Sequence, residues 1–451
     1  MLLALAIVFA SILILSIFKP TLNPGLLALT FVFFVSPLIV SPKIGGVANL
    51  FPTSLLLTLL GITFFFATLN STGLITTLLQ RILTLTKPVP HLVPAIFFAL
   101  VAVLTALGLG NIASVALIAP LAIPLADKLG ISHFLMTILI VGGANASSFS
   151  PLTVPGIFTN DFIQKSEILI EKMTPATMRW WIFWLVFLSI SATSFTSFLL
   201  LGGGNWLKLK KQFRNKTSSD NLQTIEPPQP SFTREQRQAS FLCLVLAGLF
   251  LVGCISSLPG LVGTIPGSIL TITQRFGDVG FIGWLGSSLL LLTRLGALDK
   301  GLKEVPWQTL LLVSGMSTFV ELLSRLGLPE AISAIVQHNI PNSLLPAAFA
   351  ASSGLLSAFS SSVGVALPVF FPIVEAVSKS IEASLAQTLI VAVALGSHLV
   401  DASPLSTLGA LCIAQIKDEQ AQAKTYRNLL LYSCYMIPVA ALLAFLLKLV
   451  F

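Results

Sequence analysis

The sequence predicts an all-α polytopic membrane protein, with about ten transmembrane helices and two helical hairpins in two inverted-topology repeats. Its composition, its continuous apolar runs and its recurring Gly and Pro punctuation indicate this fold class. Of the 451 residues, 55% are hydrophobic and 9% are charged, whereas soluble domains carry roughly 25% charged residues. Bilayer spans need about 20 largely apolar residues each. Because the apolar runs do not alternate with polar residues, helices are favoured over a β-barrel.

The formal net charge of +8 comes from basic residues that flank the apolar segments. We therefore interpret these residues as orienting the chain in a membrane, and we expect no nucleic-acid partner. The positive-inside rule favours a cytoplasmic central linker with both termini outside, and we expect a bacterial inner membrane. The apolar start, residues 1–18, reads as a first span rather than a cleaved signal. The four cysteines have no metal-ligand spacing.

The chain divides into two halves around one polar segment. Residues 203–238 are rich in Lys, Arg and Pro, and we expect a flexible linker there. The first repeat is expected over 1–202, with a hairpin at 91–128 and a broken helix at 133–160. The second is expected over 239–451, with a hairpin at 343–378 and a broken helix at 384–415. Residues 72–87 have the pattern of an amphipathic interfacial helix.

The two halves share their Gly and Pro punctuation. The run Ser150-Pro151-Leu152 recurs as Ser403-Pro404-Leu405, and the glycines on either side recur at the same separation. Chance matches among apolar helices would not keep Gly and Pro in the same order, so the match indicates an internal repeat. Each half has five expected spans plus a hairpin, and an odd number of spans gives the halves opposite orientations. Whether each hairpin re-enters the membrane or crosses it twice stays open.

We expect the substrate and cation sites at the interrupted segments. Pro removes a backbone donor and disfavours helix before it, so neither helix can run smoothly through Ser-Pro. A broken helix frees N–H groups that attract anions, and C=O groups that suit Na⁺ together with nearby hydroxyls. A single serine there also serves close helix packing, but clusters at matched positions favour a site. The substrate-binding residues we expect are Gly110, Asn111, Ser114, Asn145, Ser150, Ser360, Ser361, Ser362, Ser403 and Thr407.

Asp401 is the strongest single candidate for a coupling residue. An intramembrane carboxylate is costly and marks a functional site by default, and its counterpart in the first half is Ser148. We expect Asp401 to bind the coupling cation or to carry a proton. His398 precedes it by three residues on the same expected helix face and is a candidate partner, with a structural His–Asp pair as the alternative. The coupling residues we expect are Asn111, Ser148, Ser362, His398 and Asp401.

Two stretches, FPTSLLLTLLGITFFFATLNSTG and DASPLSTLGALCIA, together with the hairpin, resemble the MatC-type dicarboxylate carriers. These carriers belong to the ion transporter superfamily, alongside the divalent anion:sodium symporters. The resemblance implies inverted repeats with re-entrant hairpins and unwound helices, an elevator-type motion and common coupling to Na⁺. The symporters carry Ser-Asn-Thr at both hairpin tips. Here the tips read Gly110-Asn111-Ile112 and Ser360-Ser361-Ser362.

These observations predict a secondary active transporter, not an enzyme, for a small organic anion, most of all a dicarboxylate. Na⁺ or H⁺ would drive it, and Na⁺ is the one metal ion we expect. The alternatives are a cation/proton antiporter or inorganic anion permease of the same superfamily, a passive channel, and a membrane enzyme using Ser397, His398 and Asp401. The expected partners are the anionic substrate, the lipid bilayer and a second copy of the chain in a homodimer.

Overall fold

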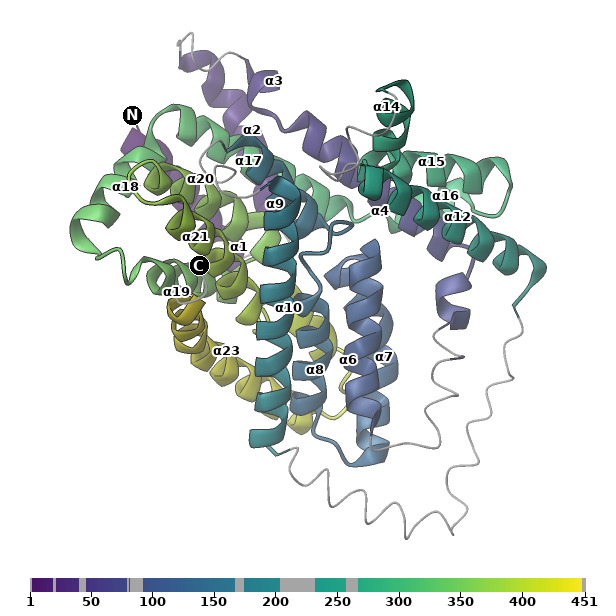
Figure 1. Ribbon diagram of the computed structural model, residues 1–451. Coiled ribbons are helices and arrows are strands. Elements are labelled where there is room, and N and C mark those ends of the chain that lie inside the picture. The colour runs from purple at the N-terminus through teal and green to yellow at the C-terminus, as the bar shows by residue number, and fades with distance from the viewer. Residues whose placement is uncertain are drawn as a thin grey trace. The chain divides into compact units, whose positions relative to one another are not determined.

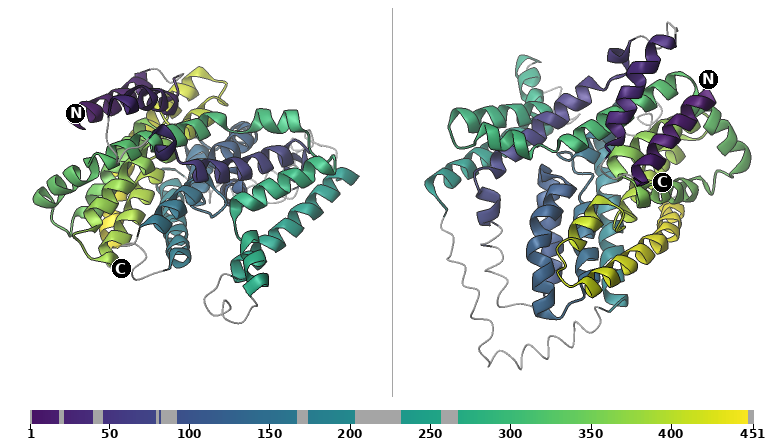
Figure 2. Two further views of the ribbon diagram at one scale, coloured as in Figure 1. Left: turned by 90° about the horizontal axis from the view of Figure 1, so that it is seen from above. Right: turned by 180° about the vertical axis from the view of Figure 1, so that it is seen from behind.

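The computed structural model describes residues 2–18, 22–39, 46–78, 81, 92–166, 174–202, 232–256 and 267–447. Every regular element in these ranges is helical (Figure 1). This confirms an all-helical fold rich in apolar helices, as expected for a polytopic membrane protein. Two further views show the same helices from above and from behind (Figure 2). Half of the predicted interfacial helix at 72–87 lies outside the described residues, and residues 74–78 of the other half are helical.

Contacts between helices divide the chain into two compact units. Unit 1 comprises Met1–Thr53, Pro94–Gly204 and Gln308–Phe451, and unit 2 comprises Ser54–Val93 and Asn205–Trp307. Each unit therefore draws on both halves of the sequence. Both Ser-Pro segments and both expected hairpin tips fall in unit 1.

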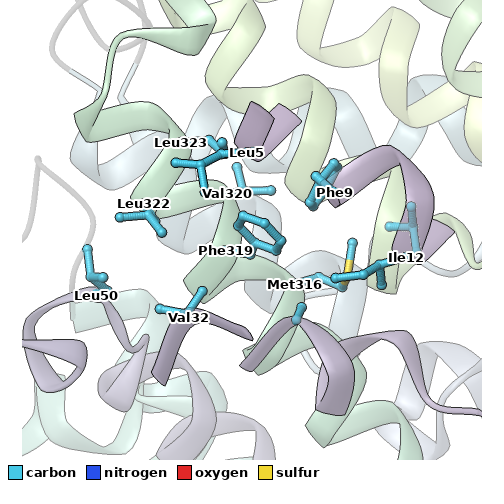
Figure 3. Packing of buried hydrophobic residues seen from close by; sticks show 12 residues of the cluster. Leu5, Phe9, Ile12, Val32, Leu50, Met316, Phe319, Val320, Leu322 and Leu323 are labelled. Carbon is cyan, nitrogen blue, oxygen red and sulfur yellow. The ribbon is translucent and has the colours of Figure 1, made fainter. Parts of the chain in front are cut away.

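Unit 1 begins with short helices that pack on a helix from the second half. Phe319 makes an edge contact with Phe9 and stacks on Phe31, each with ring centroids 5.2 Å apart. Gly25 and Gly315 let the backbones of their helices meet, since a Cβ on either would collide with the other helix. Buried apolar side chains complete this cluster (Figure 3). The helices are α1 (Leu2–Phe18), α2 (Pro24–Val35), the short η1 (Ser36–Leu38), α3 (Val47–Leu50) and α17 (Trp307–Arg325).

The remaining helices of unit 1 hold the interrupted segments. In the first half they are α6 (Val93–Leu104), the π-helical turn η3 (Thr105–Leu109), α7 (Asn111–Leu129), α8 (His133–Ala146), α9 (Val154–Lys165) and α10 (Pro175–Leu200). In the second half they are α18 (Leu328–Asn339), α19 (Leu345–Phe359), the π-helical turn η5 (Ser362–Ala366), α20 (Leu367–Ser378), α21 (Ala383–Leu399), α22 (Thr407–Ile413) and α23 (Glu419–Leu447). Helix α8 packs between α7 and α10, and α21 packs on α19 and α23.

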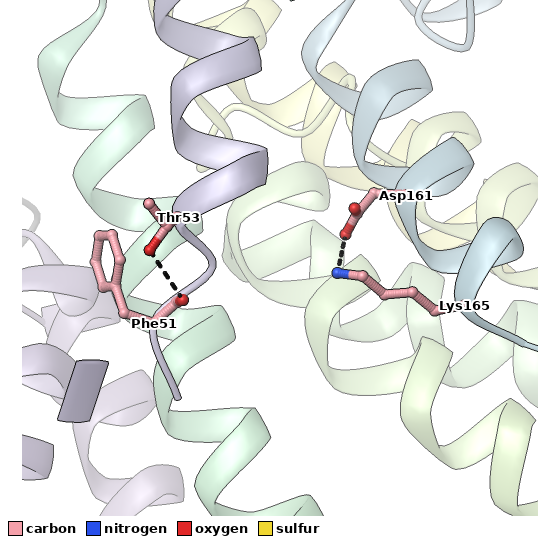
Figure 4. A network of polar contacts seen from close by, with 4 residues as sticks. All are labelled: Phe51, Thr53, Asp161 and Lys165. Atoms are coloured by element: carbon pink, nitrogen blue, oxygen red, sulfur yellow. Dashed lines mark hydrogen bonds and ion pairs between the residues drawn. The ribbon is translucent and has the colours of Figure 1, made fainter. Parts of the chain in front are cut away.

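Unit 2 is built on close helix packing. Its helices are α4 (Thr53–Asn70), α12 (Arg234–Ser256), α14 (Gly267–Phe276), α15 (Val279–Leu292) and α16 (Leu298–Glu304). The first residue of α4 still belongs to unit 1, and its hydroxyl, that of Thr53, lies 3.5 Å from the Phe51 carbonyl oxygen (Figure 4). Gly61 on α4 faces Gly280 and Gly283 on α15, with no room for a Cβ between the backbones. Small residues at such a contact are typical of membrane helices.

Three helices within the described residues are long and apolar enough to cross a membrane: α4, α10 and α23. Helices α17 and α18 form a bent pair with an angle of 73° between them, and they add a fourth if they make one span. Further apolar helices of 10–17 residues accompany these. The expectation of about ten spans stays a prediction.

Two helices begin earlier in the chain than their apolar runs. Helix α12 begins at Arg234, so the last residues of the expected linker are helical, and Gln236 donates from α12 to the Thr77 hydroxyl at 3.0 Å. Helix α23 begins at Glu419, although the apolar run starts near residue 428. Hydropathy detects the part of a helix that suits lipid, whereas a helix can extend beyond it with polar residues.

Candidate functional site

The first hairpin tip is a glycine turn. Gly108 (φ 105°) and Gly110 (φ 83°) both take positive φ angles, which L-residues rarely adopt. They separate α6 and η3 from α7. Asn111 opens α7, and its side-chain oxygen accepts the Ile112 N–H at 2.9 Å. This leaves the Asn111 amide nitrogen free to turn toward the rest of unit 1.

The first break lies between α8 and α9, from Ser147 to Thr153. The Thr153 hydroxyl caps α9 by accepting the Gly156 N–H at 3.3 Å, and it donates to the carbonyls of Ser148 and Ser150. Gly156 lies so close to the Ser150 carbonyl that a Cβ there would collide with it. The Ser150 hydroxyl donates to the Ala106 carbonyl of the hairpin at 2.5 Å. The break is therefore an ordered, cross-braced structure.

The second break, between α21 and α22, repeats this pattern. Ser406 takes the place of Thr153, and its hydroxyl lies 2.7 Å from the Asp401 carbonyl and 2.8 Å from the Ser403 carbonyl. Gly409 donates its N–H to the Ser406 hydroxyl at 3.5 Å and cannot hold a Cβ beside Ser403. The repeated hydrogen bonds and glycine contact extend the Ser-Pro match of the sequence into the backbone of both breaks.

The helices that follow the breaks pack on hairpins of the opposite half. Helix α22 packs against α7. Helix α9 reaches α20, where the Phe371 ring lies 5.9 Å from Phe158 and 5.0 Å from Phe162 between centroids. The helix that follows each break therefore packs against a hairpin helix of the other half.

The second hairpin tip differs from the first. Ser361 caps η5 by accepting the Gly364 N–H at 3.1 Å. The Ser357 hydroxyl lies 3.2 Å from the Ser362 hydroxyl and 2.6 Å from the Ser397 carbonyl, which ties the tip to α21. Ser360 bonds only to the Leu356 carbonyl of its own helix, at 2.6 Å. The second tip therefore turns through serines with ordinary negative φ angles, −143° at Ser360 and −82° at Ser361, and not through glycines with positive φ.

The tips and the breaks meet at Asn145. Its side-chain nitrogen donates to the backbone carbonyl of His398 at 3.0 Å, and its oxygen lies 3.4 Å from the Asn111 amide nitrogen. The side chains of Asn145, Ser362 and Ser406 also lie near the Asp401 carboxylate. Asn145 is 1% exposed and Asp401 is 5% exposed. A buried carboxylate ringed by a hydroxyl-rich shell can hold a proton or a small hard cation.

The expected pairing of His398 with Asp401 is wrong. His398 Nδ1 lies 3.0 Å from the Ser397 hydroxyl and 3.2 Å from the Ala394 carbonyl, while Nε2 has no hydrogen-bond partner. The ring packs on Phe149, with centroids 4.6 Å apart. Helix α21 ends at Leu399, so Asp401 no longer lies on the helix face that carries His398.

The other expected site residues divide between the cluster and its surroundings. Ser114 is fully buried beside the first tip, with no hydrogen-bond partner for its hydroxyl. The hydroxyls of Ser148 and Ser403 are occupied locally, by the Ala144 carbonyl at 3.0 Å and the Leu405 N–H at 3.2 Å. Thr407 is exposed at the first position of α22. The cluster at Asp401 therefore gathers Asn111, Asn145 and Ser362 from the expected set.

Ser357 and Ser406 are absent from the expected set, yet both lie beside the cluster. Ser406 carries a signal in the sequence, because it occupies the position that matches Thr153 in the repeat. Ser357 lies one helical turn before the Ser360-Ser361-Ser362 run. A hydroxyl there faces the same side as the tip, and this spacing is the signal that could have found it.

Comparisons with known proteins bear on the first third of the chain. Residues 1–148 match the family model described as the dicarboxylate carrier protein MatC N-terminus, which confirms the resemblance for that region. No curated protein matches the chain. Among solved structures, the chain is similar to the YdaH transporter of Alcanivorax borkumensis, at 15% identity over 89% of this chain and 86% of that one, with a TM-score of 0.46.

The matched region contains the first hairpin tip and reaches the start of the first break. Together with the apolar helices, the match supports an integral membrane protein that acts as a transporter. The substrate, the coupling ion and the mechanism rest on the arguments that follow.

Proposed function

We propose that the protein is a secondary active transporter that moves a small dicarboxylate with Na⁺ or H⁺ coupling. One observation carries the proposal: two helix breaks with the same hydrogen-bond pattern are joined in one compact unit around the buried Asp401. Broken helices near the middle of a membrane are how secondary transporters bind substrate and ions together. The carrier family that residues 1–148 match supports the dicarboxylate class.

The anion would bind through neutral groups at the tips and breaks. The opening turns of α7 and α9 carry N–H groups, and the side chains of Asn111 and Ser114 lie at the first tip. Helix N-termini and neutral donors favour carboxylates without a fixed positive charge.

The coupling cation would bind at Asp401. The oxygens of its carboxylate and of Ser362 are the ligand type that a hard cation takes, and the same carboxylate can carry a proton instead. Both breaks and both tips lie in unit 1. They would therefore travel as one body, which is the arrangement that an elevator-type motion needs.

Uptake into proteoliposomes tests the proposal. Purified protein would be given radiolabelled malonate, succinate and glutarate, with and without inward Na⁺ or H⁺ gradients. We expect saturable uptake that depends on one of the gradients and is absent from protein-free liposomes. No uptake across the panel would contradict the substrate class, uptake without saturation would indicate a channel, and product turnover in detergent would indicate an enzyme.

Cation/proton antiport is the second candidate, and the buried carboxylate of Asp401 favours it. An antiporter would dissipate a pH gradient when Na⁺ is added without any organic anion. The proposed symporter would move no cation until a dicarboxylate is added, so it would leave the pH gradient unchanged in that assay.

A further inference from the structure

The orientation of the Asn145 amide is fixed by its neighbours. A backbone carbonyl can only accept a hydrogen bond, so the Asn145 nitrogen must face the His398 carbonyl. Its oxygen then faces Asn111. The Asn111 oxygen is engaged by the Ile112 N–H, so the Asn111 nitrogen must face Asn145. One consistent chain of donors and acceptors therefore runs from the first tip to the second break.

Both polar atoms of the Asn145 amide have partners within the protein. The nitrogen donates to the His398 carbonyl, and the oxygen faces Asn111. The Asn145 side chain is 1% exposed, so an anion that reached it would have to displace one of these partners.

The bonding of the two breaks differs at the position of Asp401. In the first break, the Ser148 N–H donates to the Asn145 backbone carbonyl at 3.2 Å. The equivalent carbonyl in the second break belongs to His398, and it accepts from the Asn145 side chain. The two breaks share their other backbone bonds, so this one carbonyl is where the second break receives a side chain of the first half in place of its own backbone N–H.

We infer that Asn145 is a positioning residue that couples the hairpin tip at Asn111 to the segment that carries Asp401. An anion that draws the Asn111 amide toward itself changes the partner of the Asn145 oxygen. The Asn145 nitrogen, and with it the His398 carbonyl at the start of the segment that carries Asp401, then responds. Substrate binding at the tip and cation binding at Asp401 are linked through this one side chain. The inference rests on the proposed function and adds the path of its coupling.

Binding affinity measured with and without the cation tests this inference. Calorimetry on the full-length protein in detergent would use malonate, succinate and glutarate, each at zero and at saturating NaCl and at two pH values. Binding linkage is reciprocal and typically amounts to 5–150-fold, so we expect at least about fivefold tighter anion binding by the wild type when the cation is present. In Asn145→Ala the ratio of the anion affinity with the cation to the anion affinity without it should fall to within about twofold of one.

Two further variants keep the test decisive. Asn111→Ala removes the hydrogen bond to the Asn145 oxygen and leaves the bond from Asn145 to His398. It should therefore lower the affinity ratio even if Asn145→Ala folds poorly. Ser353→Ala removes a buried hydroxyl that lies 3.3 Å from the Val393 carbonyl of α21. This hydroxyl takes no part in the hydrogen bonds between Asn111, Asn145 and His398, so the variant should keep the wild-type affinity ratio. A merely structural role for Asn145 would lower thermal stability and leave the ratio unchanged.

The outcomes separate this inference from the proposed function. A wild type that binds an anion with cation dependence, beside Asn145→Ala and Asn111→Ala variants that keep the same dependence, would overturn this inference alone. A wild type that binds none of the three anions with any dependence on Na⁺ or pH would overturn both.

Discussion

Asn145 and His398 occupy equivalent positions in the two halves, 253 residues apart, and the Asn145 side-chain amide donates to the His398 carbonyl at 3.0 Å. Equivalent residues of two repeats can touch where a pseudo-symmetry axis passes between them. The contact is unequal, because one partner offers its side chain and the other its backbone. Asp401 lies on the side that receives the bond, which is where we expect the cation.

The carboxylate of Asp401 should be indispensable for coupling. We expect Asp401→Asn to reduce cation-driven uptake at least tenfold, because the amide carries neither the charge nor the exchangeable proton of the acid. Uptake by proteoliposomes with an inward gradient measures this. Asp127→Asn is the control, since that side chain is 64% exposed and pairs with His133 at 2.7 Å. Full cation-dependent uptake by Asp401→Asn would rule the role out.

Ser150 should matter more than Ser360. The Ser150 hydroxyl ties the first break to the hairpin through the Ala106 carbonyl, whereas that of Ser360 bonds within its own helix. A hydrogen bond contributes about 1 kcal/mol, so Ser150→Ala should lower the uptake rate about fivefold and Ser360→Ala should leave it nearly unchanged. Equal rates for the two variants would show that the cross-brace is not needed.

The glycines after the breaks should not tolerate a methyl group. Gly156→Ala and Gly409→Ala each force a Cβ against a backbone carbonyl, and overpacking of this kind costs about 1–3 kcal/mol. Thermal unfolding in detergent should show a lower midpoint for both. Gly248→Ala, inside α12, whose Cβ would meet nothing within 4 Å, should not lower the midpoint, because Ala is the better helix former. Wild-type midpoints for both break variants would mean that the breaks can relax.

Phe319 should be the most costly truncation in the packing of α17. It is fully buried and contacts Phe9 and Phe31, so Phe319→Ala should destabilise unit 1 by about 3 kcal/mol. Phe34→Ala, at a side chain that is 72% exposed, is the matched control. Chemical unfolding in detergent measures both, and equal effects would contradict the packing in Figure 3.

The ion pair of Asp161 and Lys165 should contribute little. Its atoms lie 2.7 Å apart, one helical turn apart on α9 (Figure 4), and the Lys165 side chain is 67% exposed. Exposed pairs of this spacing are worth about 0.3–0.5 kcal/mol. Lys165→Ala should therefore leave the unfolding midpoint within about one degree of the wild type. A larger loss would mean that Lys165 has a further role.

The helix breaks could be predicted from the sequence because their cause is local. Ser-Pro in each half disfavours a continuous helix, and α8 and α21 end before Pro151 and Pro404. The repeat then predicted that the two breaks match, and their hydrogen bonds do. The expected repeat boundaries and the inverted orientation remain predictions.

The contacts across the site could not be predicted, because they arise from packing between distant segments. Nothing in the sequence near Asn145 points to His398, and the spacing of His398 and Asp401 suggested a different partner. That suggestion assumed a helix through Asp401, whereas α21 ends at Leu399. The positions of the helix ends therefore decided which side chains meet.

Accumulation of a dicarboxylate against its own gradient tests the central claim most directly. Proteoliposomes would start with equal labelled succinate, malonate or glutarate on both sides, under an inward Na⁺ or H⁺ gradient. We predict that one of the three rises above its external concentration inside, that collapse of the cation gradient by an ionophore reverses the rise, and that Asp401→Asn abolishes it. Internal concentrations that never exceed the external ones, for any of the three under either gradient, would contradict coupled transport.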